Sequence, residues 1–246
     1  MNYNWHWTVF FQEAMPGVTY LDWLLTGLKL TLAIGLGGWL IALVLGTLLG
    51  VMRTVPNRAV ARFAGAYVEF FRNIPLLVQL FTWYFVAPEL LPGDLGQRVK
   101  ALNPLMQQFL AAVVCLGMFT AARICEQVRA GIQSLPRGQR DAGLAIGLTL
   151  PQTYRYIMLP VAFRIITPPL TSEFMTVFKN SAVASMIGLL ELAAQGRQLV
   201  DYTSQPYESF IAVTVLYVAV NLSALRVMRW VEGRTRIPGL LGMREQ

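Results

Sequence analysis

The sequence predicts an all-α integral membrane protein with five transmembrane helices and one short cytoplasmic helix. Three observations lead to this fold class. Apolar residues make up 55% of the 246 residues and charged residues only 13%, whereas soluble domains carry roughly 25% charged residues. The apolar residues gather in five long runs, each of a length suited to crossing a bilayer. The basic residues gather in alternate connecting segments.

The same composition excludes several classes of protein. Disordered chains combine low hydrophobicity with high charge, and soluble enzymes need a more highly charged surface. Cys115 and Cys125 rule out a disulfide framework, because one helix would hold them about 15 Å apart. His6 is the single histidine, so we expect no histidine-rich metal site. No lysine lies in a Walker loop, so we expect no ATP site, no cofactor and no enzymatic activity on this chain.

The five apolar runs differ in regularity. The first follows a segment without Lys or Arg, which favours an uncleaved helix over a signal peptide. The fourth contains Pro160, Pro168 and Pro169 and is expected to be the most strongly broken span. A shorter apolar piece, 181–194, is interpreted as a re-entrant or outward-facing helical segment. The expected spans are 24–52, 70–91, 105–128, 156–178 and 209–228.

The distribution of basic residues predicts the orientation. Three segments on one side carry 12 basic residues and three on the other side carry 4, namely 53–66, 129–156 and 226–246 against 1–22, 87–104 and 179–208. The positive-inside rule then puts the N-terminus outside and the C-terminus inside. The net charge of +7 is therefore interpreted as a topology signal rather than as a nucleic-acid-binding surface. The expected parts are an outer segment 1–22, a transmembrane domain 23–230 and a cytoplasmic tail 231–246.

Small residues recur every four positions in the first span, at Gly38, Ala42, Gly46 and Gly50. Such a row lets two helix backbones approach closely, so it predicts a helix-packing face. The alternative is that glycine is simply common in membrane helices. The sequence leaves open whether the packing partner lies in this chain or in another subunit.

Two pairs of ionisable residues lie inside or beside the apolar runs. Glu69 precedes Arg72 by three residues, and Arg123 precedes Glu126 by three. Residues at this spacing are neighbours on a helix surface, so local ion pairs are the favoured interpretation of both.

Arg164 is interpreted differently, because it lies among the prolines of the fourth span. Broken helices are tolerated inside a membrane where they line a cavity or are buried in protein. We therefore predict a translocation path lined by Arg164, with Arg72 and Glu173 as further candidates. The alternative is a structural role, in which Arg164 pairs with Glu173 or with freed backbone carbonyls.

Segment 134–160, SLPRGQRDAGLAIGLTLPQTYRYIMLP, predicts two helices that meet at a glycine. The stretch 141–146 is short and amphipathic, and Gly147 is placed to end it. Thr149 with Gln152 matches a capping box that starts the next helix. A short helix on the basic side of the membrane is typical of a docking element for a cytoplasmic partner, although an ordinary connecting loop is the alternative.

This segment resembles the loop of ABC-importer permeases whose pattern is E-A-A, a later glycine, and I-x-L-P. The matching residues are Asp141, Ala142, Gly143, Gly147 and 157–160, with Asp in place of Glu and Gly in place of the second Ala. Three other stretches resemble the polar amino-acid branch of that family: FFRNIPLLVQLFTWYF at 70–85, AARICEQVRAGIQSLPRGQ at 121–139 and PPLTSEFMTVFKNSAVASMIGL at 168–189. The start YNWHWTVFFQ, with RTVPNR at 53–58 and PELLP at 88–92, is similar to permeases of glutamate and aspartate importers.

The resemblance implies a multi-pass permease subunit of the bacterial inner membrane, with a periplasmic N-terminus, that imports L-glutamate and L-aspartate. It implies four partners: a separate ABC ATPase subunit that carries ATP and Mg, a second permease subunit, identical or homologous, a periplasmic amino-acid-binding protein, and membrane lipid. In the family the E-A-A loop, here 134–155, forms the coupling helix that sits in a cleft of the ATPase. By position, the residues at that interface are Gln139, Arg140, Asp141, Ala142, Gly143, Ile146 and Gly147.

Other functions stay open at this point. In the nearest alternative, the chain is a permease for another polar amino acid, such as glutamine or arginine. A stand-alone channel or ion-driven carrier is a second alternative. A carrier more often shows an internal repeat with two matching broken segments, and this sequence has one strongly broken span. A membrane-embedded enzyme fits poorly with one histidine and no clustered acidic site. The sequence does not decide whether selectivity lies in this chain or in the binding protein.

Overall fold

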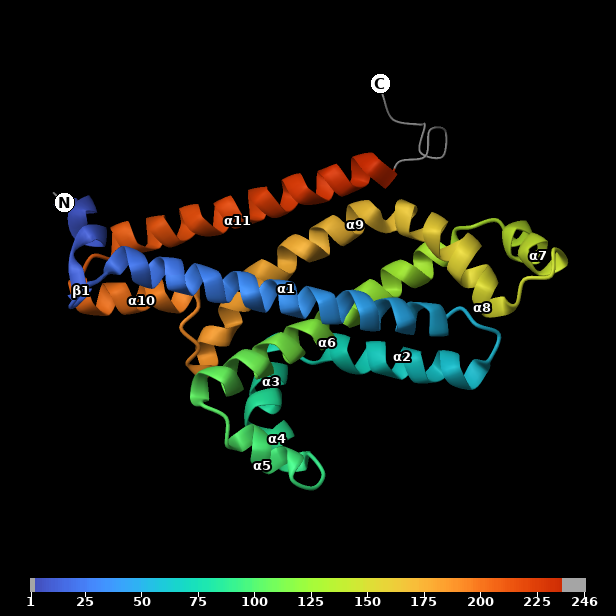
Figure 1. The fold of residues 1–246 in the computed structure, drawn as a ribbon, viewed down its shortest axis with the longest axis horizontal. Coiled ribbons are helices and arrows are strands. Elements are labelled where there is room, and N and C mark those ends of the chain that lie inside the picture. The colour runs from blue at the N-terminus through green and yellow to red at the C-terminus, as the bar shows by residue number, and fades with distance from the viewer. Residues whose placement is uncertain (1–2, 236–246) are drawn as a thin grey trace. The chain divides into compact units, whose positions relative to one another are not determined.

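Helices make up nearly all of the chain in the computed structural model, which describes residues 3–235 (Figure 1). The part of the predicted tail after 235, with Arg236 and Arg244 of the charge count, lies outside the described residues. The first elements are η1 (Trp7–Phe11), β1 (Glu13–Met15), β2 (Val18–Thr19), α1 (Tyr20–Met52), α2 (Arg58–Asn73), α3 (Leu76–Phe81), η2 (Thr82–Val86), α4 (Ala87–Leu90) and α5 (Leu95–Lys100). The later elements are α6 (Pro104–Gln133), α7 (Arg137–Ala145), α8 (Leu150–Thr153), η3 (Tyr154–Met158), α9 (Leu159–Asn180), η4 (Ser181–Ile187), α10 (Leu192–Thr203) and α11 (Pro206–Thr235).

The chain forms two compact units, each assembled from three stretches of sequence. Among the described residues, unit 1 comprises 3–40, 74–117 and 176–222, and unit 2 comprises 41–73, 118–175 and 223–235. The four longest helices α1, α6, α9 and α11 contribute residues to both units. The two units are described separately below.

Within residues 3–235, three helices are long and apolar enough to cross a membrane: α1, α6 and the part of α11 up to Arg234. A fourth candidate is the bent pair Leu150–Ile187 and Leu192–Thr203, whose two parts meet at 51°. The apolar stretch Leu76–Leu90 is shorter. A mostly helical membrane protein is therefore the observed class, while the count of five spans and the orientation stay predictions.

The second expected span, 70–91, is not one helix. Helix α2 ends at Asn73, and α3 begins at Leu76 after Pro75. Proline lacks an N–H group and disfavours the helical conformation of the residue before it, so the chain turns at Ile74 and Pro75. A π-helical turn, η2, and the short α4 complete the stretch.

The expected break at the prolines of the fourth span is wrong. Helix α9 continues through Pro168 and Pro169, although each proline removes one backbone hydrogen bond. The hydroxyl of Thr167, just before the two prolines, donates to the carbonyl oxygen of Phe163 at 2.7 Å. The break lies further along, where the 3₁₀ helix η4 ends at Gly188 with φ of +87°.

Glu191 holds this break in unit 1, within the segment that the sequence singled out at 181–194. Its buried carboxylate caps α10 by accepting hydrogen bonds from the N–H groups of Ala193 and Ala194. The hydroxyl groups of Thr31 and Tyr217 also donate to Glu191, at 3.3 and 2.7 Å. A buried carboxylate with four donors explains how a break of this kind persists among apolar helices.

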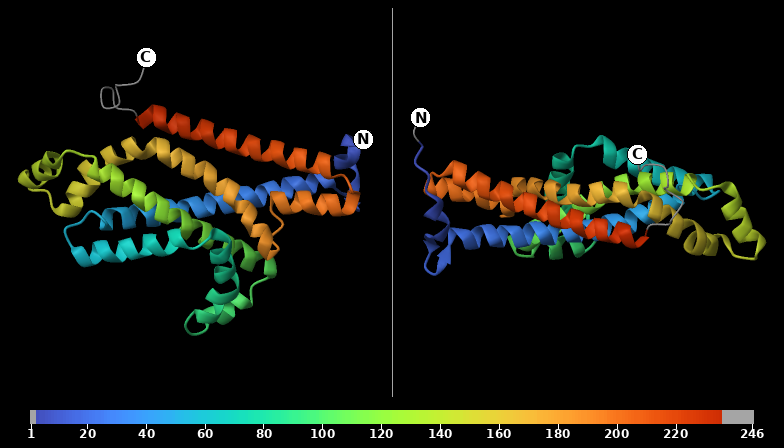
Figure 2. Two further views of the ribbon diagram at one scale, coloured as in Figure 1. Left: turned by 180° about the vertical axis from the view of Figure 1, so that it is seen from behind. Right: turned by 90° about the horizontal axis from the view of Figure 1, so that it is seen from above.

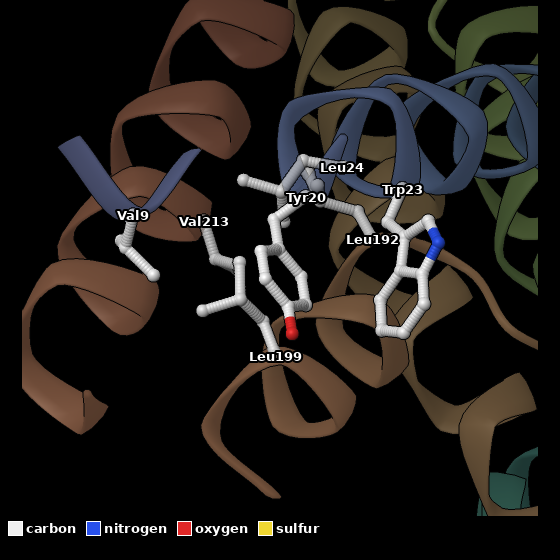
Figure 3. Close-up of a cluster of buried hydrophobic side chains, with 7 residues drawn as sticks. All are labelled: Val9, Tyr20, Trp23, Leu24, Leu192, Leu199 and Val213. Atoms are coloured by element: carbon white, nitrogen blue, oxygen red, sulfur yellow. The ribbon is translucent and has the colours of Figure 1, made fainter. Parts of the chain in front are cut away.

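The core of unit 1 joins the N-terminal segment to α1, α10 and α11 (Figure 3). Its buried members are Val9, Tyr20, Trp23, Leu24, Leu192, Leu199 and Val213. The small hairpin of β1 and β2, whose turn is formed by Pro16 and Gly17, was not expected from the sequence. Gly17 has φ of +75°, so the Pro-Gly pair was the available signal.

The N-terminal segment is also held by buried Glu208 at the start of α11. The Tyr3 hydroxyl and the backbone N–H of His6 both donate to this carboxylate. Desolvation, together with the hydrogen bond to Glu208, raises the pKa of the Tyr3 hydroxyl to about 12. The hydroxyl therefore stays a donor at physiological pH.

The row of small residues on α1 lies against α6. In unit 1, a Cβ atom built at Gly38 would lie 3.2 Å from Cβ of Leu116. In unit 2, one built at Gly46 would lie 2.7 Å from Cβ of Ile124, and one at Gly50 would lie 2.6 Å from Cβ of Val128. Ala42 between them is fully buried. The packing partner of this row is thus inside the same chain.

Candidate functional site

The first candidate region is α7 in unit 2, which ends at a glycine as predicted. It begins at Arg137, four residues before the expected start and directly after Pro136, whose backbone is extended. The N–H of Gly147 donates to the carbonyl of Leu144 at 3.0 Å, and that of Leu148 donates to Gly143 at 3.1 Å. These two bonds, with φ of +88° at Gly147, form a Schellman motif.

Helix α7 packs against the helical segment that follows it, and the two lie side by side in Figures 1 and 2. A Cβ atom at Gly143 would lie 2.8 Å from both Ile157 Cδ1 and Thr153 Cγ2, so glycine permits this close approach. The predicted capping box is present at the start of α8, where the N–H of Thr149 donates to Gln152 Oε1 at 2.8 Å. The two helices therefore form a well-defined elbow.

The face of α7 that points away from this elbow is exposed. Asp141, Ala142 and Leu144 are exposed, and Ile146 is 75% exposed. Gln139 and Arg140 are half-buried, whereas Gly143 is buried. The predicted interface residues thus form two groups. Gly143 lies on the buried side of α7, against the following helix, and the others lie on the outward side.

The second candidate region is a polar face of α6 in unit 2. Phe119, Arg123, Glu126 and Gln127 recur at spacings that bring them to one side of the helix. The guanidinium of Arg123 lies 5.0 Å from the centre of the Phe119 ring, within the range of a cation–π contact. This face therefore presents both charged and aromatic groups.

The expected local ion pair between Arg123 and Glu126 is wrong. Arg123 instead pairs with Glu173 of α9, with 3.6 Å between the nitrogen and oxygen atoms. Glu126 pairs with Arg53 at 2.5 Å and with Arg129 at 2.7 Å. Two cations converge on Glu126 because the end of α1 and the next turn of α6 both reach it.

These residues line a polar cavity of about 480 Å³ in unit 2. Its walls are Arg72, Phe119, Arg123, Glu126, Gln127 and Glu173. Two of the three residues predicted for a translocation path, Arg72 and Glu173, are thus brought together, while the third, Arg164, is exposed elsewhere on α9. Within residues 3–235, Arg72 forms no ion pair and no side-chain hydrogen bond.

Arg123 and Gln127 were missed as cavity residues by the sequence reasoning. The spacing of 119, 123, 126 and 127 was the available signal, since it marks one helix face. The expected ion pair of Glu69 with Arg72 is not formed in the described part of the chain. Glu69 instead lines a second cavity of about 580 Å³, together with Arg53, Arg58, Arg62 and Arg129. No group of three or more metal-binding side chains occurs among the residues that the structure describes.

Comparison with known proteins gives one matching family model and a set of similar sequences. The model, described as "Binding-protein-dependent transport system inner membrane component", matches residues 42–237. The chain is 53% identical to the glutamate/aspartate import permease protein GltJ of Escherichia coli (strain K12), over 98% of this chain and 99% of that protein. It is 34% identical to the glutamate/aspartate import permease protein GltK of Escherichia coli O6:H1, over 95% and 99%.

Solved structures with a similar fold include two transporters. A chain from "Crystal structure of an amino acid ABC transporter with histidines" has a TM-score of 0.70 and 28% identity, covering 87% of this chain and 95% of that chain. A chain of the MetNI methionine ABC transporter in an inward-facing conformation has a TM-score of 0.69 and 24% identity, covering 88% and 98%. The second likeness concerns the fold alone.

Proposed function

The chain belongs to the family of inner-membrane components of binding-protein-dependent transport systems, and on that premise we propose that it is the permease subunit of an ABC importer for L-glutamate and L-aspartate. The single observation that supports this choice of substrate is the 53% identity to GltJ over nearly the full length of both proteins. The ATP that drives import is hydrolysed by a separate ATPase subunit, which holds the nucleotide and Mg.

The ATPase docks on the exposed face of α7. Three observations support this role: the helix is short, it ends in a Schellman motif at Gly147, and it exposes Leu144 and Ile146. Exposed apolar side chains beside charged ones are typical of a protein interface. The interface comprises Gln139, Arg140, Asp141, Ala142, Ile146 and Gly147, with Gly143 behind it.

The chain crosses the membrane five times, with its N-terminus in the periplasm and its C-terminus in the cytoplasm. The support is the bias of 12 basic residues against 4 between the two sets of connecting segments. In this arrangement α7 lies in the cytoplasm, where an ATPase is able to reach it.

A second permease subunit and a periplasmic binding protein complete the complex. One organism, Escherichia coli O6:H1, has both a GltJ and a GltK, each named a glutamate/aspartate import permease protein. We infer that the second permease of this complex is a GltK-like chain. The substrate passes along a path that includes Arg72 and Glu173, and Arg164 is a further predicted member.

Uptake by a reconstituted complex tests the proposal. The chain is purified with its ATPase and the second permease, inserted into liposomes with ATP inside, and supplied with the binding protein. Labelled glutamate and aspartate should accumulate, and glutamine and arginine should not. Accumulation of glutamine or arginine alone would assign a different polar amino acid, and uptake without the ATPase would indicate a carrier or channel.

A further inference from the structure

We propose that the second cavity of unit 2, about 580 Å³ in volume, binds the phosphate groups of an anionic phospholipid through its arginine side chains. It is termed the arginine cavity here, and its charged lining residues are Arg53, Arg58, Arg62, Glu69 and Arg129. The inference does not depend on the transported substrate. It uses the proposed orientation of the chain only to assign the cavity to the cytoplasmic leaflet.

The charges around the arginine cavity leave a surplus that an anion neutralises. Arg53 and Arg129 share one carboxylate partner, Glu126, at 2.5 and 2.7 Å. Glu69 is the one carboxylate among the described residues that line the cavity. Four guanidinium groups and two carboxylates therefore leave an excess of two positive charges. This excess matches one lipid with two phosphodiester groups, or two lipids with one each.

Two of the arginines are free to bind a ligand. Arg58 and Arg62 are exposed, and neither forms an ion pair or a side-chain hydrogen bond within residues 3–235. They lie four residues apart, so they are neighbours on one face of α2. Guanidinium groups bind phosphate through two parallel hydrogen bonds and stay charged in poorly hydrated sites.

The other two arginines are held in place around the same cavity. Arg129 donates to Glu126 and, at 2.9 Å, to Oε1 of Gln133. Arg53 donates to Glu126 and lies beside α2, where a Cβ atom built at Gly65 would be 4.0 Å from its Cζ atom. The cavity therefore combines two oriented guanidinium groups with two that have no partner, an arrangement suited to an anion with several oxygen atoms.

The position of the arginine cavity favours a lipid over a soluble phosphate. Arg53 directly follows Met52, the last residue of α1, which is long and apolar enough to span a membrane. The cavity thus lies at the end of a span, where lipid headgroups are found. Beside it on α2, Phe63 and Phe70 are 66% and 59% exposed, one turn on either side of the lining residue Ala66. A helix that exposes both arginine and phenylalanine is typical of a membrane interface.

A bound lipid would connect helices that are distant in sequence. The arginines come from the end of α1, from α2 and from α6, so one headgroup would hold the α1–α2 connection against α6. Basic pockets between helices on the cytoplasmic side of a membrane are typical sites for anionic headgroups. We therefore expect the stability of the protein to depend on anionic lipid.

The test is native mass spectrometry of the purified complex, stripped of lipid and titrated with cardiolipin, phosphatidylglycerol or phosphatidylcholine. Both anionic lipids should bind to saturation and raise the unfolding temperature, and phosphatidylcholine should do neither. The double variant Arg58→Gln/Arg62→Gln should bind cardiolipin about 10- to 30-fold more weakly, because two cations near the membrane surface are lost. Arg58→Lys/Arg62→Lys should recover most of this loss, because the charge is kept.

The matched control is Arg226→Gln/Arg229→Gln, which removes two exposed arginines of α11 on the same predicted side of the membrane but outside the cavity. Equal losses in the two glutamine double variants would show attraction by general surface charge and would overturn the site. Ala66→Glu is an independent variant that leaves all four arginines in place. Its carboxylate would lie one turn from Arg62 and should also weaken lipid binding.

Other results also decide against the proposal. Equal binding of phosphatidylcholine and cardiolipin by the wild-type complex would overturn it. Displacement of cardiolipin by an equimolar amount of inorganic phosphate would assign the cavity to a soluble anion. Loss of the ATPase subunit from Arg58→Gln/Arg62→Gln, with lipid binding unchanged, would assign it to a protein interface. The proposed function fails separately, if the complete wild-type system does not import glutamate.

Discussion

Replacing Gly147 with leucine should preserve membrane insertion but remove most transport. Gly147 has φ of +88°, and both hydrogen bonds of the Schellman motif depend on that turn. No atom lies within 4 Å of a Cβ atom built at Gly147, so steric overlap adds nothing to the cost. The cost is that of the left-handed conformation in a residue with a side chain, roughly 1–2 kcal/mol. A penalty of this size lowers the population of the native turn by roughly 5- to 30-fold.

The assay compares transport with substrate-stimulated ATP hydrolysis in purified, reconstituted complex. Gly147→Leu should lose most of both activities at normal complex yield, because α7 no longer ends in the orientation that the ATPase requires. Gly147→Ala should lose nearly as much, since its backbone penalty is similar. Gly147→Asn should stay closer to wild type, because asparagine tolerates positive φ.

The pattern among these variants decides the cause. A defect in Gly147→Leu with normal activity in Gly147→Ala would show that the bulky side chain obstructs the docking surface, so the turn would not be responsible. Wild-type transport and ATP hydrolysis in Gly147→Leu would refute the role assigned to this helix end.

Three further predictions concern topology, packing and the path. A reporter fused after Glu245 should be active only as a cytoplasmic fusion, and a periplasmic signal there would overturn the five-span arrangement. Gly46→Leu should destabilise the protein by about 1–3 kcal/mol in thermal unfolding, because its side chain would collide with Ile124. The control Gly233→Leu, at a helical position with nothing within 4 Å of a Cβ atom built there, should not lower the stability. Arg164→Gln should lower glutamate uptake more than complex yield; full uptake at normal yield would remove Arg164 from the path.

Much of the local structure was predictable from the sequence because it depends on neighbours along the chain. The end of α7 at Gly147 and the capping box at Thr149 and Gln152 follow from the conformations and hydrogen bonds available to those residues. The long apolar helices follow from the cost of leaving backbone groups unpaired in hydrocarbon. These features need no knowledge of distant contacts.

The location of helix breaks was less predictable. Pro75 interrupts the chain between α2 and α3, yet Pro168 and Pro169 lie inside a continuous α9. Proline lacks the N–H group that would continue the helical hydrogen bonds, yet α9 stays helical on both sides of Pro168 and Pro169. The actual break at Gly188 depends on Glu191, whose donors come from three separate helices.

By itself the sequence determined the class of protein, the extent of most helices, the short helix that ends at Gly147 and the family, because hydrophobic runs, turn residues and motifs are encoded locally. Only the tertiary structure decided that Arg123 pairs with Glu173 while Glu126 pairs with Arg53, and that Arg123, Glu126 and Glu173 line a cavity together with Arg72. Spacing along a helix shows which residues share a face. It does not show which helix lies opposite that face, because ion pairs between helices are set by packing between segments far apart in the chain.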